Sequence, residues 1–369
     1  FNQVMALGDP DGFNAPSIGS EDIAFLQYTG GTTGVAKGAT LTHANIVANI
    51  MQVHAWLESG LPKDNNIVIT PLPLYHIFSL TVNCFILFSA GALNVLITNP
   101  RDIPGFIKEL NNWKFTCITG VNTLFRGLLN HPDFKNVDFS SLKVAVGGGM
   151  AVQKPVADQW VQTTKVPLVE GYGLTETSPC ACVNPLNIKG FTGHIGLPLP
   201  STEVSIKDDQ ENNLPLGEVG EIAIKGPQVM RGYWRRQEET DKVMSKDGYF
   251  KSGDMGFMDE KGYVKLVDRK KDMILVSGFN VYPNEIEEVV CQHPKVLEAA
   301  AVGVHSDKSG QAVKLFIVKK DTSLTEDEVK DHCRENLTGY KNPKFIEFRD
   351  DLPKSNVGKI LRKDLRENA

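Results

Sequence analysis

The sequence contains few cysteines and no arrangement of them that would stabilise a small fold. Among its six cysteines only Cys180 and Cys182 lie close together, and the second pair that a zinc ribbon requires is absent. A disulfide framework and a zinc ribbon are therefore excluded as organising features. We expect the chain to function in a reducing compartment.

The sequence also lacks an excess of positive charge, internal repeats and low-complexity segments. Its 39 Lys and Arg residues against 44 Asp and Glu residues give a net charge of −5, which argues against a protein that coats nucleic acid. Hydrophobic residues make up 41% and charged residues 22% of the 369 residues, as in folded soluble proteins. A chain of this length predicts two or three domains, each with its own core.

One long stretch has no Asp, Glu, Lys or Arg, which raises the question of a membrane-spanning helix. The part between Ile77 and Ile97 is long enough to cross a bilayer. It contains several polar side chains, however, and a break at residues 89–91. We therefore expect a buried helix followed by a β-strand at residues 93–98 rather than a membrane span.

The first half of the chain alternates short apolar runs with amphipathic runs, which is typical of an α/β protein with a mostly parallel, helix-covered sheet. Strands are expected at residues 22–28, 66–70, 93–98, 115–119, 142–146 and 166–170, and helices at 42–57, 103–113, 123–130 and 152–163. Several strands lead into loops rich in Gly, Thr or Pro. Because ligands of open α/β sheets bind beyond the carboxyl ends of strands, we expect these loops to line one crevice.

The rest of the chain has a different character. Residues 196–270 contain short β-like segments separated by turns, and predict a small β-rich subdomain after the α/β part at residues 1–195. Residues 271–369 predict a C-terminal α+β domain. Its expected elements are a helix near Pro283, strands at 297–304, 313–319 and 345–348, and a helix capped at Thr325.

A loop rich in glycine and threonine follows the first expected strand, between Tyr28 and Gly38. Its backbone N–H groups, its hydroxyls and Lys37 would together wrap a polyphosphate. It is not a Walker A motif, because Ala36 and not glycine precedes the lysine, and neither this loop nor residues 171–176 match G-x-G-x-x-G. Taken alone, such a loop is also compatible with a flexible surface turn.

A second segment that would carry chemistry begins at Gly171. Tyr172 lies between two glycines and would present an aromatic face to a base, since the glycines allow close approach. Thr175 and Glu176 would supply oxygens suited to a magnesium ion that bridges phosphates. The plain alternative is a strand end with an ordinary turn and a solvated glutamate.

Two further sites lie later in the chain. Asp254, placed before a turn, and Arg269, in a strand-like context, would reach a pair of ribose hydroxyls, although a surface ion pair is the commoner role of such residues. Lys359 lies on a loop before a basic helical tail, where a lysine is commonly just solvated.

The order and spacing of these segments together resemble the adenylate-forming enzymes of the acyl-CoA synthetase type. The matching segments are 28–38, 71–78, 171–177, 253–254, 268–287 and 353–361. Within that superfamily, residues 268–283 and 352–362 are most similar to bacterial long-chain fatty acid–CoA ligases. The resemblance covers nearly the whole chain.

The resemblance implies a reaction in two steps. Such enzymes join a carboxylic acid to AMP, using ATP and releasing pyrophosphate, and then transfer the acyl group to the thiol of coenzyme A. Two anions meet in the first step, so positive charge and hydrogen-bond donors have to neutralise them. The implied roles are triphosphate binding by Thr29, Gly30, Gly31, Thr32, Thr33, Gly34 and Lys37, a phosphate contact by Thr175, Mg²⁺ binding by Glu176, adenine binding by Gly148, Gly149, Gly171 and Tyr172, ribose binding by Asp254 and Arg269, a place near the acyl carboxylate for His76, and catalysis by Lys359.

The resemblance also implies movement of the C-terminal domain. Lys359 would bridge the carboxylate and the α-phosphate in the first step, but its loop then covers the carbonyl carbon that coenzyme A must reach. In the family this domain rotates about a hinge, which corresponds here to Lys271. Gly278 would then face the channel for the thiol.

The chain departs from the family pattern at its beginning. Members of the family ordinarily carry a long α/β segment before the glycine-rich loop, whereas only about 28 residues precede it here and the first residue is Phe1. We therefore expect the chain to be a truncated part of a full enzyme.

The expected ligands are a fatty acid, ATP, Mg²⁺ and coenzyme A, with no nucleic acid. Three alternatives stay open: activation of a medium-chain or aryl acid, a non-catalytic fragment that binds acyl groups or nucleotides, and membrane transport. The expected location is the cytoplasm, where peripheral contact with the inner face of the membrane and oligomer formation are both compatible with the sequence.

Overall fold

The computed structural model of the protein describes residues 2–9, 12, 14–29, 36–355 and 358–367. Its largest sheet has seven strands in the order β4-β3-β5-β6-β7-β8-β9, of which β4 to β7 are parallel and the last two antiparallel. The strands are β3 (Ile67–Thr70), β4 (Leu93–Leu96), β5 (Cys117–Gly120), β6 (Val144–Gly147), β7 (Leu168–Gly173), β8 (Cys180–Val183) and β9 (Leu197–Pro198). The expected α/β fold with a mostly parallel sheet is confirmed.

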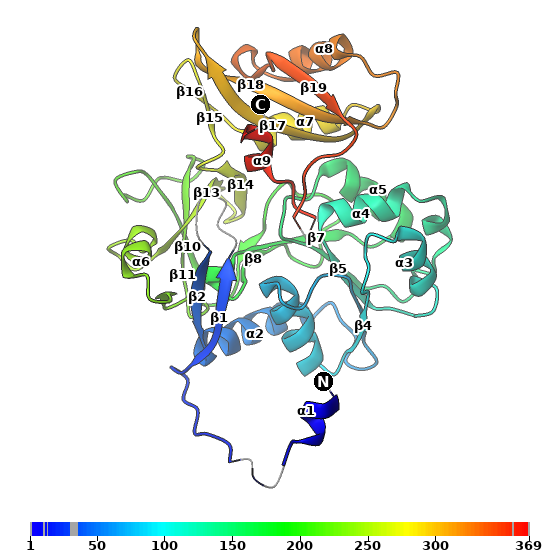
Figure 1. The fold of residues 1–369 in the computed structure, drawn as a ribbon, viewed down its shortest axis with the longest axis vertical. Coiled ribbons are helices and arrows are strands. Elements are labelled where there is room, and N and C mark those ends of the chain that lie inside the picture. The colour runs from blue at the N-terminus through cyan, green and yellow to red at the C-terminus, as the bar shows by residue number, and fades with distance from the viewer. Residues whose placement is uncertain (1, 10–11, 13, 30–35, 356–357, 368–369) are drawn as a thin grey trace.

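Helices pack against this sheet in two groups (Figure 1). One group contains α3 (Ile103–Leu110), α4 (Asn122–Asn130) and α5 (Lys154–Thr164), and the other α2 (His43–Leu57) with the π-helix η2 (Ser79–Leu87). A short 3₁₀ turn, η3 (Pro132–Asn136), follows α4, and the terminal helix α1 (Asn2–Ala6) buries none of its residues.

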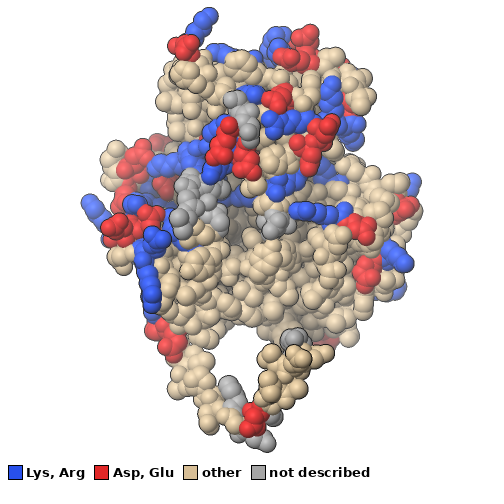
Figure 2. All heavy atoms as spheres, viewed as in Figure 1, with Lys and Arg blue, Asp and Glu red and all other residues tan. Residues whose placement is uncertain are grey.

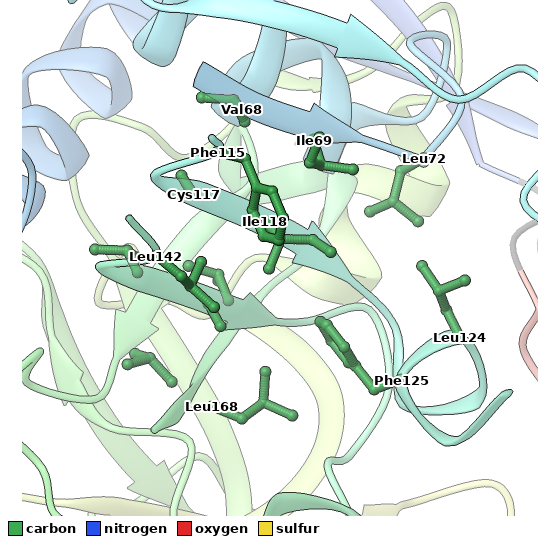
Figure 3. Close-up of a cluster of buried hydrophobic side chains, with 14 of the residues drawn as sticks. Val68, Ile69, Leu72, Phe115, Cys117, Ile118, Leu124, Phe125, Leu142 and Leu168 are labelled. Carbon is green, nitrogen blue, oxygen red and sulfur yellow. The ribbon is translucent and has the colours of Figure 1, made fainter. Parts of the chain in front are cut away.

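The core of this part lies between the sheet and its helices. β-branched residues of the strands, such as Val68 and Ile118, belong to one buried cluster with Phe125 of α4 and Leu168 of β7 (Figure 3). Such residues suit a pleated sheet that is covered on its faces. This packing holds the carboxyl ends of the parallel strands, where the glycine-rich loops begin, in fixed positions.

The strand expected at residues 22–28 exists, but its assignment to the parallel sheet is wrong. It is β1 (Ile23–Thr29), and it pairs antiparallel with β2 (Lys37–Thr42) in a separate sheet that β12 (Gly232–Tyr233) completes. Too few residues separate β1 from β2 for a parallel crossover, so the chain returns as a hairpin. Thr29 and Lys37 are cross-strand partners at the open end of this hairpin.

Residues 196–270 form the expected β-rich region, in part as a four-stranded antiparallel sheet in the order β10-β11-β13-β14. Its strands are β10 (Glu203–Lys207), β11 (Gly220–Lys225), β13 (Phe250–Met258) and β14 (Val264–Arg269), and α6 (Gln237–Val243) precedes β13. The sequence did not predict β13. Asp254 lies inside this strand rather than before a turn. The strand is hard to predict because the glycines at 253 and 256 obscure the alternation of apolar residues.

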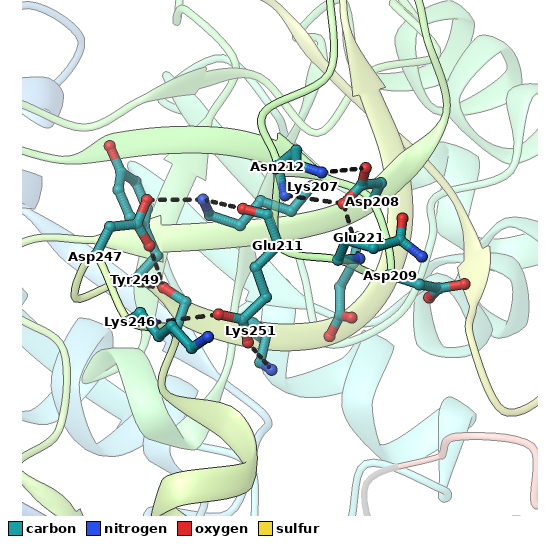
Figure 4. A network of polar contacts seen from close by, with 12 residues as sticks. Lys207, Asp208, Asp209, Glu211, Asn212, Glu221, Lys246, Asp247, Tyr249 and Lys251 are labelled. Atoms are coloured by element: carbon teal, nitrogen blue, oxygen red, sulfur yellow. Dashed lines mark hydrogen bonds and ion pairs between the residues drawn. The ribbon is translucent and has the colours of Figure 1, made fainter.

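A buried lysine stabilises this sheet from within. The side chain of Lys207 is 1% exposed, and its ammonium donates to Asp247 Oδ2 at 2.8 Å, to Asn213 Oδ1 at 2.9 Å and to the Glu211 carbonyl at 3.2 Å (Figure 4). All three donors of the ammonium thus have acceptors, as a charge removed from water requires.

The C-terminal residues form a five-stranded sheet in the order β16-β15-β18-β17, with β19 parallel to β18. The elements are β15 (Ile274–Val276), β16 (Phe279–Val281), α7 (Pro283–Cys291), β17 (Val296–Ser306), β18 (Gly310–Lys319), α8 (Glu326–Asn336), η5 (Gly339–Lys341), β19 (Phe345–Arg349) and α9 (Arg362–Glu367). Thr325 caps α8 through a capping box with Glu328, as its sequence predicts. The chain between β19 and α9 runs towards the end of β7 (Figure 1).

The long uncharged stretch divides as the sequence predicts. Its first part is the π-helix η2 and its second part is β4, with Gly91 in a left-handed turn between them. None of the helices in the described part of the chain has the length and the apolar character that crossing a membrane requires. All six cysteines are free thiols.

Candidate active site

Loops from the carboxyl ends of β5, β6 and β7 meet at one edge of the large sheet. Gly148 follows β6 and is packed so closely that a Cβ there would lie 3.1 Å from Cε1 of Phe78 and 3.3 Å from the carbonyl oxygen of Gly171. Gly149 adopts a left-handed conformation, with φ of +74°. Glycine is needed at both positions, and the three glycines predicted to surround the adenine lie together.

Tyr172, the fourth residue predicted for the adenine site, is directed into the protein. Its side chain packs in a cluster with Ala181 and Ile195, and its hydroxyl donates to Asp254 Oδ2 at 2.7 Å. Burial, reinforced by the negative charge of Asp254, raises the pKa of this tyrosine well above its usual value. The tyrosine thus stays a hydrogen-bond donor that orients the carboxylate.

Asp254 and Arg269, the two residues predicted to reach a ribose, are neighbours across β13 and β14. They are cross-strand partners, and Arg269 Nε lies 3.5 Å from Asp254 Oδ1. The side chain of Asp254 is almost wholly buried, with two oxygens that retain lone pairs beyond the bond to Tyr172. A pair of hydroxyl groups is the kind of donor that such a carboxylate accepts.

Lys37 and Glu176 both contact Tyr233, a residue of β12: Lys37 lies over the face of its ring and Glu176 binds its hydroxyl. Lys37 Nζ is 4.8 Å from the centre of the tyrosine ring and 2.7 Å from Glu239 Oε2, and the tyrosine hydroxyl donates to Glu176 Oε1 at 2.7 Å. Thr175 and Glu176 lie in the 3₁₀ turn η4 (Thr175–Thr177), directly after β7. The residues predicted for the triphosphate and for Mg²⁺ are therefore adjacent.

The remaining residues predicted for the triphosphate, Gly30, Gly31, Thr32, Thr33 and Gly34, lie outside the described residues. Beside Glu176 and Tyr233 the structure has a pocket of about 350 Å³, which Glu221, Lys251 and Lys270 also line. Charged side chains of both signs gather along the line where the C-terminal part meets the rest of the molecule (Figure 2).

The loop that carries Lys359 is docked on the large sheet. Thr123 at the start of α4 donates to the carbonyl of Gly358 at 3.2 Å, and a Cβ on Gly358 would lie 2.8 Å from the same hydroxyl. Gly358 also has a φ of +81°, so both the contact and the backbone require glycine. This docking brings Lys359 from the end of the chain to the loops of the parallel strands.

The surroundings of Lys359 depress its basicity. Burial lowers the pKa of the Lys359 ammonium to about 7, and the positive charge of Arg269 adds to this effect, while Asp254 opposes it. An anion that bound beside Lys359 and Arg269 would stabilise the ammonium form and raise the pKa of Lys359 towards its ordinary value.

His76 belongs to the same electrostatic environment. Its Nδ1 accepts the N–H of Phe78 at 3.3 Å, which leaves Nε2 as the N–H of the neutral ring. Burial lowers the pKa of His76, and the charge of Lys359 lowers it further. The structure thus brings together His76, Tyr172, Asp254, Arg269 and Lys359, which come from four distant parts of the sequence.

Gly278 lies apart from this cluster, whereas Lys271 borders it, because its positive charge contributes to the lowered pKa of Lys359. Lys271 follows β14 and is exposed, at the point where the chain passes into the C-terminal sheet. Gly278 lies in the exposed turn between β15 and β16 with φ of +86°, and a Cβ there would meet nothing within 4 Å.

Three residues of the site escaped the sequence analysis. Tyr233 binds Glu176 and Thr123 binds the Lys359 loop, whereas Glu170 in the middle of β7 is a buried carboxyl group whose Oε1 accepts the Val152 N–H at 3.1 Å. Tyr233 and Thr123 lie in no motif with a chemical signature of its own, and Glu170 directly precedes the segment that begins at Gly171 but was given no role. Their roles follow from tertiary neighbours that no local pattern reveals.

A resident metal has no ready-made site here. No group of three or more His, Cys, Asp and Glu side chains that would hold a metal ion occurs within the ranges that the structure describes. A single carboxylate such as that of Glu176 is nevertheless sufficient for an ion such as Mg²⁺. This ion commonly takes one or two carboxylates and completes its coordination with substrate phosphates and water.

The fold and this cluster define an α/β protein whose C-terminal part places a lysine over the carboxyl edge of a parallel sheet. A family profile described as AMP-binding enzyme matches residues 4–234, and a second, described as AMP-binding enzyme C-terminal domain, matches residues 285–359. The chain belongs to the AMP-binding enzyme family.

Individual relatives agree with this assignment. The chain is 60% identical over 369 residues to a long-chain-fatty-acid–CoA ligase of Escherichia coli O6:H1, a match that covers 100% of this chain and 66% of the relative. The chain thus spans slightly less than two thirds of the length of that relative.

Solved structures of related proteins share the fold. ATP-bound MatB from Rhodopseudomonas palustris superimposes with a TM-score of 0.89 at 32% identity, covering 99% of this chain and 72% of that one. The o-succinylbenzoate–CoA synthetase of Bacillus subtilis, in complex with ATP and magnesium ion, gives a TM-score of 0.82 at 29% identity, covering 94% of this chain and 70% of that one.

Proposed function

We propose that this chain carries the adenylation and thioester-forming site of a long-chain fatty acid–CoA ligase. ATP and a fatty acid would give acyl-AMP and pyrophosphate, and coenzyme A would then displace AMP. The observation that carries this proposal is the docking of the Lys359 loop on Thr123 at the start of α4, where the charges of Arg269 and Asp254 act on the lysine. The 60% identity to a ligase of that name supports the choice of substrate class.

The chemistry of the first step fits these residues. The carboxylate of the acid and the α-phosphate of ATP repel each other, so a cation has to lie between them as the new bond forms. Lys359 would occupy that place, with Arg269 beside it. In water both cations would be screened, but their partial burial strengthens each interaction.

The other residues would position the nucleotide. Asp254 would accept the ribose hydroxyls, and the glycines at 148, 149 and 171 would allow the adenine to approach the backbone. Lys37 would exchange its half-exposed partner Glu239 for a phosphate. A Mg²⁺ ion held by Glu176 would neutralise part of the triphosphate charge.

The second step would require a different arrangement of the C-terminal part, for which we propose rotation about Lys271. We also propose that the chain divides into an α/β part, a β-rich subdomain and a C-terminal domain, with boundaries at residues 195 and 270. Coenzyme A would be the acyl acceptor. The protein would act in the cytoplasm, where ATP and coenzyme A are present.

The direct test is release of pyrophosphate by the 369-residue chain. The chain is incubated with ATP, Mg²⁺ and one acid at a time from a panel of short, medium, long and aryl acids, with and without coenzyme A. Lys359→Ala serves as the variant and Lys363→Ala, in the exposed part of α9, as its matched control. We expect release that depends on a long acid and on Lys359, whereas Lys363→Ala behaves as the wild type.

Each contrary outcome has a definite meaning. Release with an aryl or medium-chain acid in preference to a long one overturns the substrate class but keeps the chemistry. Absence of release with every acid contradicts catalysis by this chain.

A further inference from the structure

A buried carboxylate lies at the end of β14, three residues before the proposed hinge at Lys271. Asp268 is 0% exposed, and its two oxygens accept the N–H groups of Arg269 and Asn284, each at 2.7 Å. Arg362 Nη1 lies 3.4 Å from Oδ1. Two of these three donors, Asn284 and Arg362, come from beyond the hinge.

The contact with Asn284 completes the start of a helix. Asn284 lies in the first turn of α7, whose preceding residue, Tyr282, makes no side-chain capping bond. The first N–H groups of a helix need acceptors, and a negative charge there is favourable. Asp268, in β14 before the hinge, supplies both the acceptor and the negative charge to this helix, which lies after the hinge.

The contact with Arg362 leads directly to the catalytic loop, since this arginine follows Lys359 by three residues. Its guanidinium is bound by Glu287 through two contacts, Nε to Oε1 at 2.9 Å and Nη2 to Oε2 at 2.7 Å, and lies 3.5 Å from Asp272 Oδ2. These two acceptors follow Lys271 in the chain, as Arg362 does. Among the described residues, Asp268 is the one ionic partner of Arg362 that precedes the hinge.

Rotation about Lys271 would therefore separate these partners selectively. Arg362 would keep Glu287 and Asp272, which move with it, and would lose Asp268. Asp268 would lose both donors from the C-terminal part at once. Burial already raises the pKa of Asp268 to about 6, with Arg362 opposing this effect, so the carboxylate depends on that partner to stay ionised.

We propose that Asp268 is a positioning residue that latches the C-terminal part in the arrangement in which Lys359 is docked, through Arg362 and the amino end of α7. This inference rests on the proposed two-step function, and it adds a device that favours the first step over the second. Release of the latch accompanies each turnover.

A merely structural ion pair is the competing explanation, and the chain offers a matched control for it. Asp272 also contacts Arg362, and it binds Arg366 at 2.8 Å, but it lies after the hinge. Asp268→Asn and Asp272→Asn each replace a carboxylate that faces Arg362 by a neutral amide. The first removes an ion pair across the hinge, and the second removes one within the C-terminal part.

The first measurement separates the half-reactions. Adenylation is followed as pyrophosphate release, and thioester formation as consumption of supplied acyl-AMP by coenzyme A. We expect Asp268→Asn to slow adenylation by about tenfold, the usual effect of losing a hydrogen bond to a charged group, and to leave thioester formation unchanged or faster. Asp272→Asn should change the two half-reactions by similar factors. Equal losses in Asp268→Asn, as would follow from damage to the neighbouring Arg269, overturn the latch.

The second measurement does not depend on activity. Spin labels at Lys135→Cys and Lys308→Cys, both exposed and on opposite sides of the hinge, report the distance between the two parts after Cys84 and Cys180 are changed to Ser. We expect Asp268→Asn to reduce several-fold the fraction of molecules that have the label distance of this structure. Asp268→Glu keeps the charge and should restore part of that fraction. Asp272→Asn should leave the fraction unchanged. The same distribution in wild type and Asp268→Asn overturns the latch. Absence of pyrophosphate release by the wild type contradicts the proposed function instead, and leaves this distance test in force.

Discussion

The hydroxyl of Tyr172 donates a 2.7 Å hydrogen bond to Oδ2 of Asp254. A direct hydrogen bond thus joins the residue predicted for the adenine site to the residue predicted for the ribose site. Asp254 also lies 3.5 Å from Arg269 Nε, so one carboxylate connects β7, β13 and β14. The two subsites that the sequence suggests separately form one unit.

The bond between Tyr172 and Asp254 predicts the effect of removing the tyrosine hydroxyl. Tyr172→Phe keeps the ring but leaves the buried carboxylate of Asp254 without its donor, and a hydrogen bond to a charged group contributes about 1.5–3 kcal/mol. We expect KM for ATP in pyrophosphate release to rise by roughly tenfold, with a smaller change in kcat. Tyr249→Phe is the control, because it removes a similar bond, to Glu203 at 2.8 Å, outside the site. Equal effects of the two variants would show that orientation of Asp254 is unimportant.

The environment of Lys359 predicts a dependence on pH. The ammonium form is required between two anions, and the pKa of about 7 in the free protein means that this form is lost as the pH rises above 7. We expect kcat/KM for ATP to fall by about tenfold per pH unit above that value, since this parameter reports the free enzyme. Lys359→Arg, which keeps its charge, should be slower but should lack this fall. The same fall in the arginine variant would assign it to another group.

The turn at Gly278 predicts a separation of the two half-reactions. A Cβ there meets nothing within 4 Å in the arrangement seen here, so Gly278→Leu should preserve adenylation and impair thioester formation if this turn later lines the thiol channel. The φ of +86° disfavours any side chain, at a cost of about 1–2 kcal/mol. Gly278→Ala shares that strain without the bulk and is the matched control. Equal loss of both half-reactions in the leucine variant would remove Gly278 from the channel.

Glu170 predicts a link between pH and stability. Burial raises the pKa of its carboxyl group from 4.5 to about 8, and Glu288 of α7 adds to this effect. Between these values the folded protein keeps a proton that the unfolded chain has released. The free energy of unfolding should therefore fall as the pH rises through this window, by at most about 1.4 kcal/mol per pH unit.

Glu170→Gln keeps the shape of the side chain and an acceptor for the Val152 N–H, but it cannot ionise. Urea unfolding of both proteins from about pH 5 to about pH 9 measures the difference. We expect the variant to gain stability relative to the wild type as the pH rises. A difference that does not change with pH would mean that Glu170 is already ionised in the folded protein.

Local patterns in the sequence were sufficient for most elements. The capping box at Thr325, the alternation of apolar runs and the break near Gly91 each predict what the structure has, because they act within a few residues. Two failures also have local causes. β13 lacks a clear alternation because glycines interrupt it, and β1 leaves the parallel sheet because a short connection makes a hairpin.

The sequence by itself determined the α/β class, the order of the elements and membership of the family, since these depend on periodicity and on motifs of neighbouring residues. Only the tertiary structure decided which side chains meet. Tyr233 beneath Glu176, Thr123 against the Lys359 loop and Asp268 against Arg362 are contacts between distant segments. Such contacts depend on strand register and on how the C-terminal part docks, which arise when the whole chain buries its apolar surface and satisfies its buried charges.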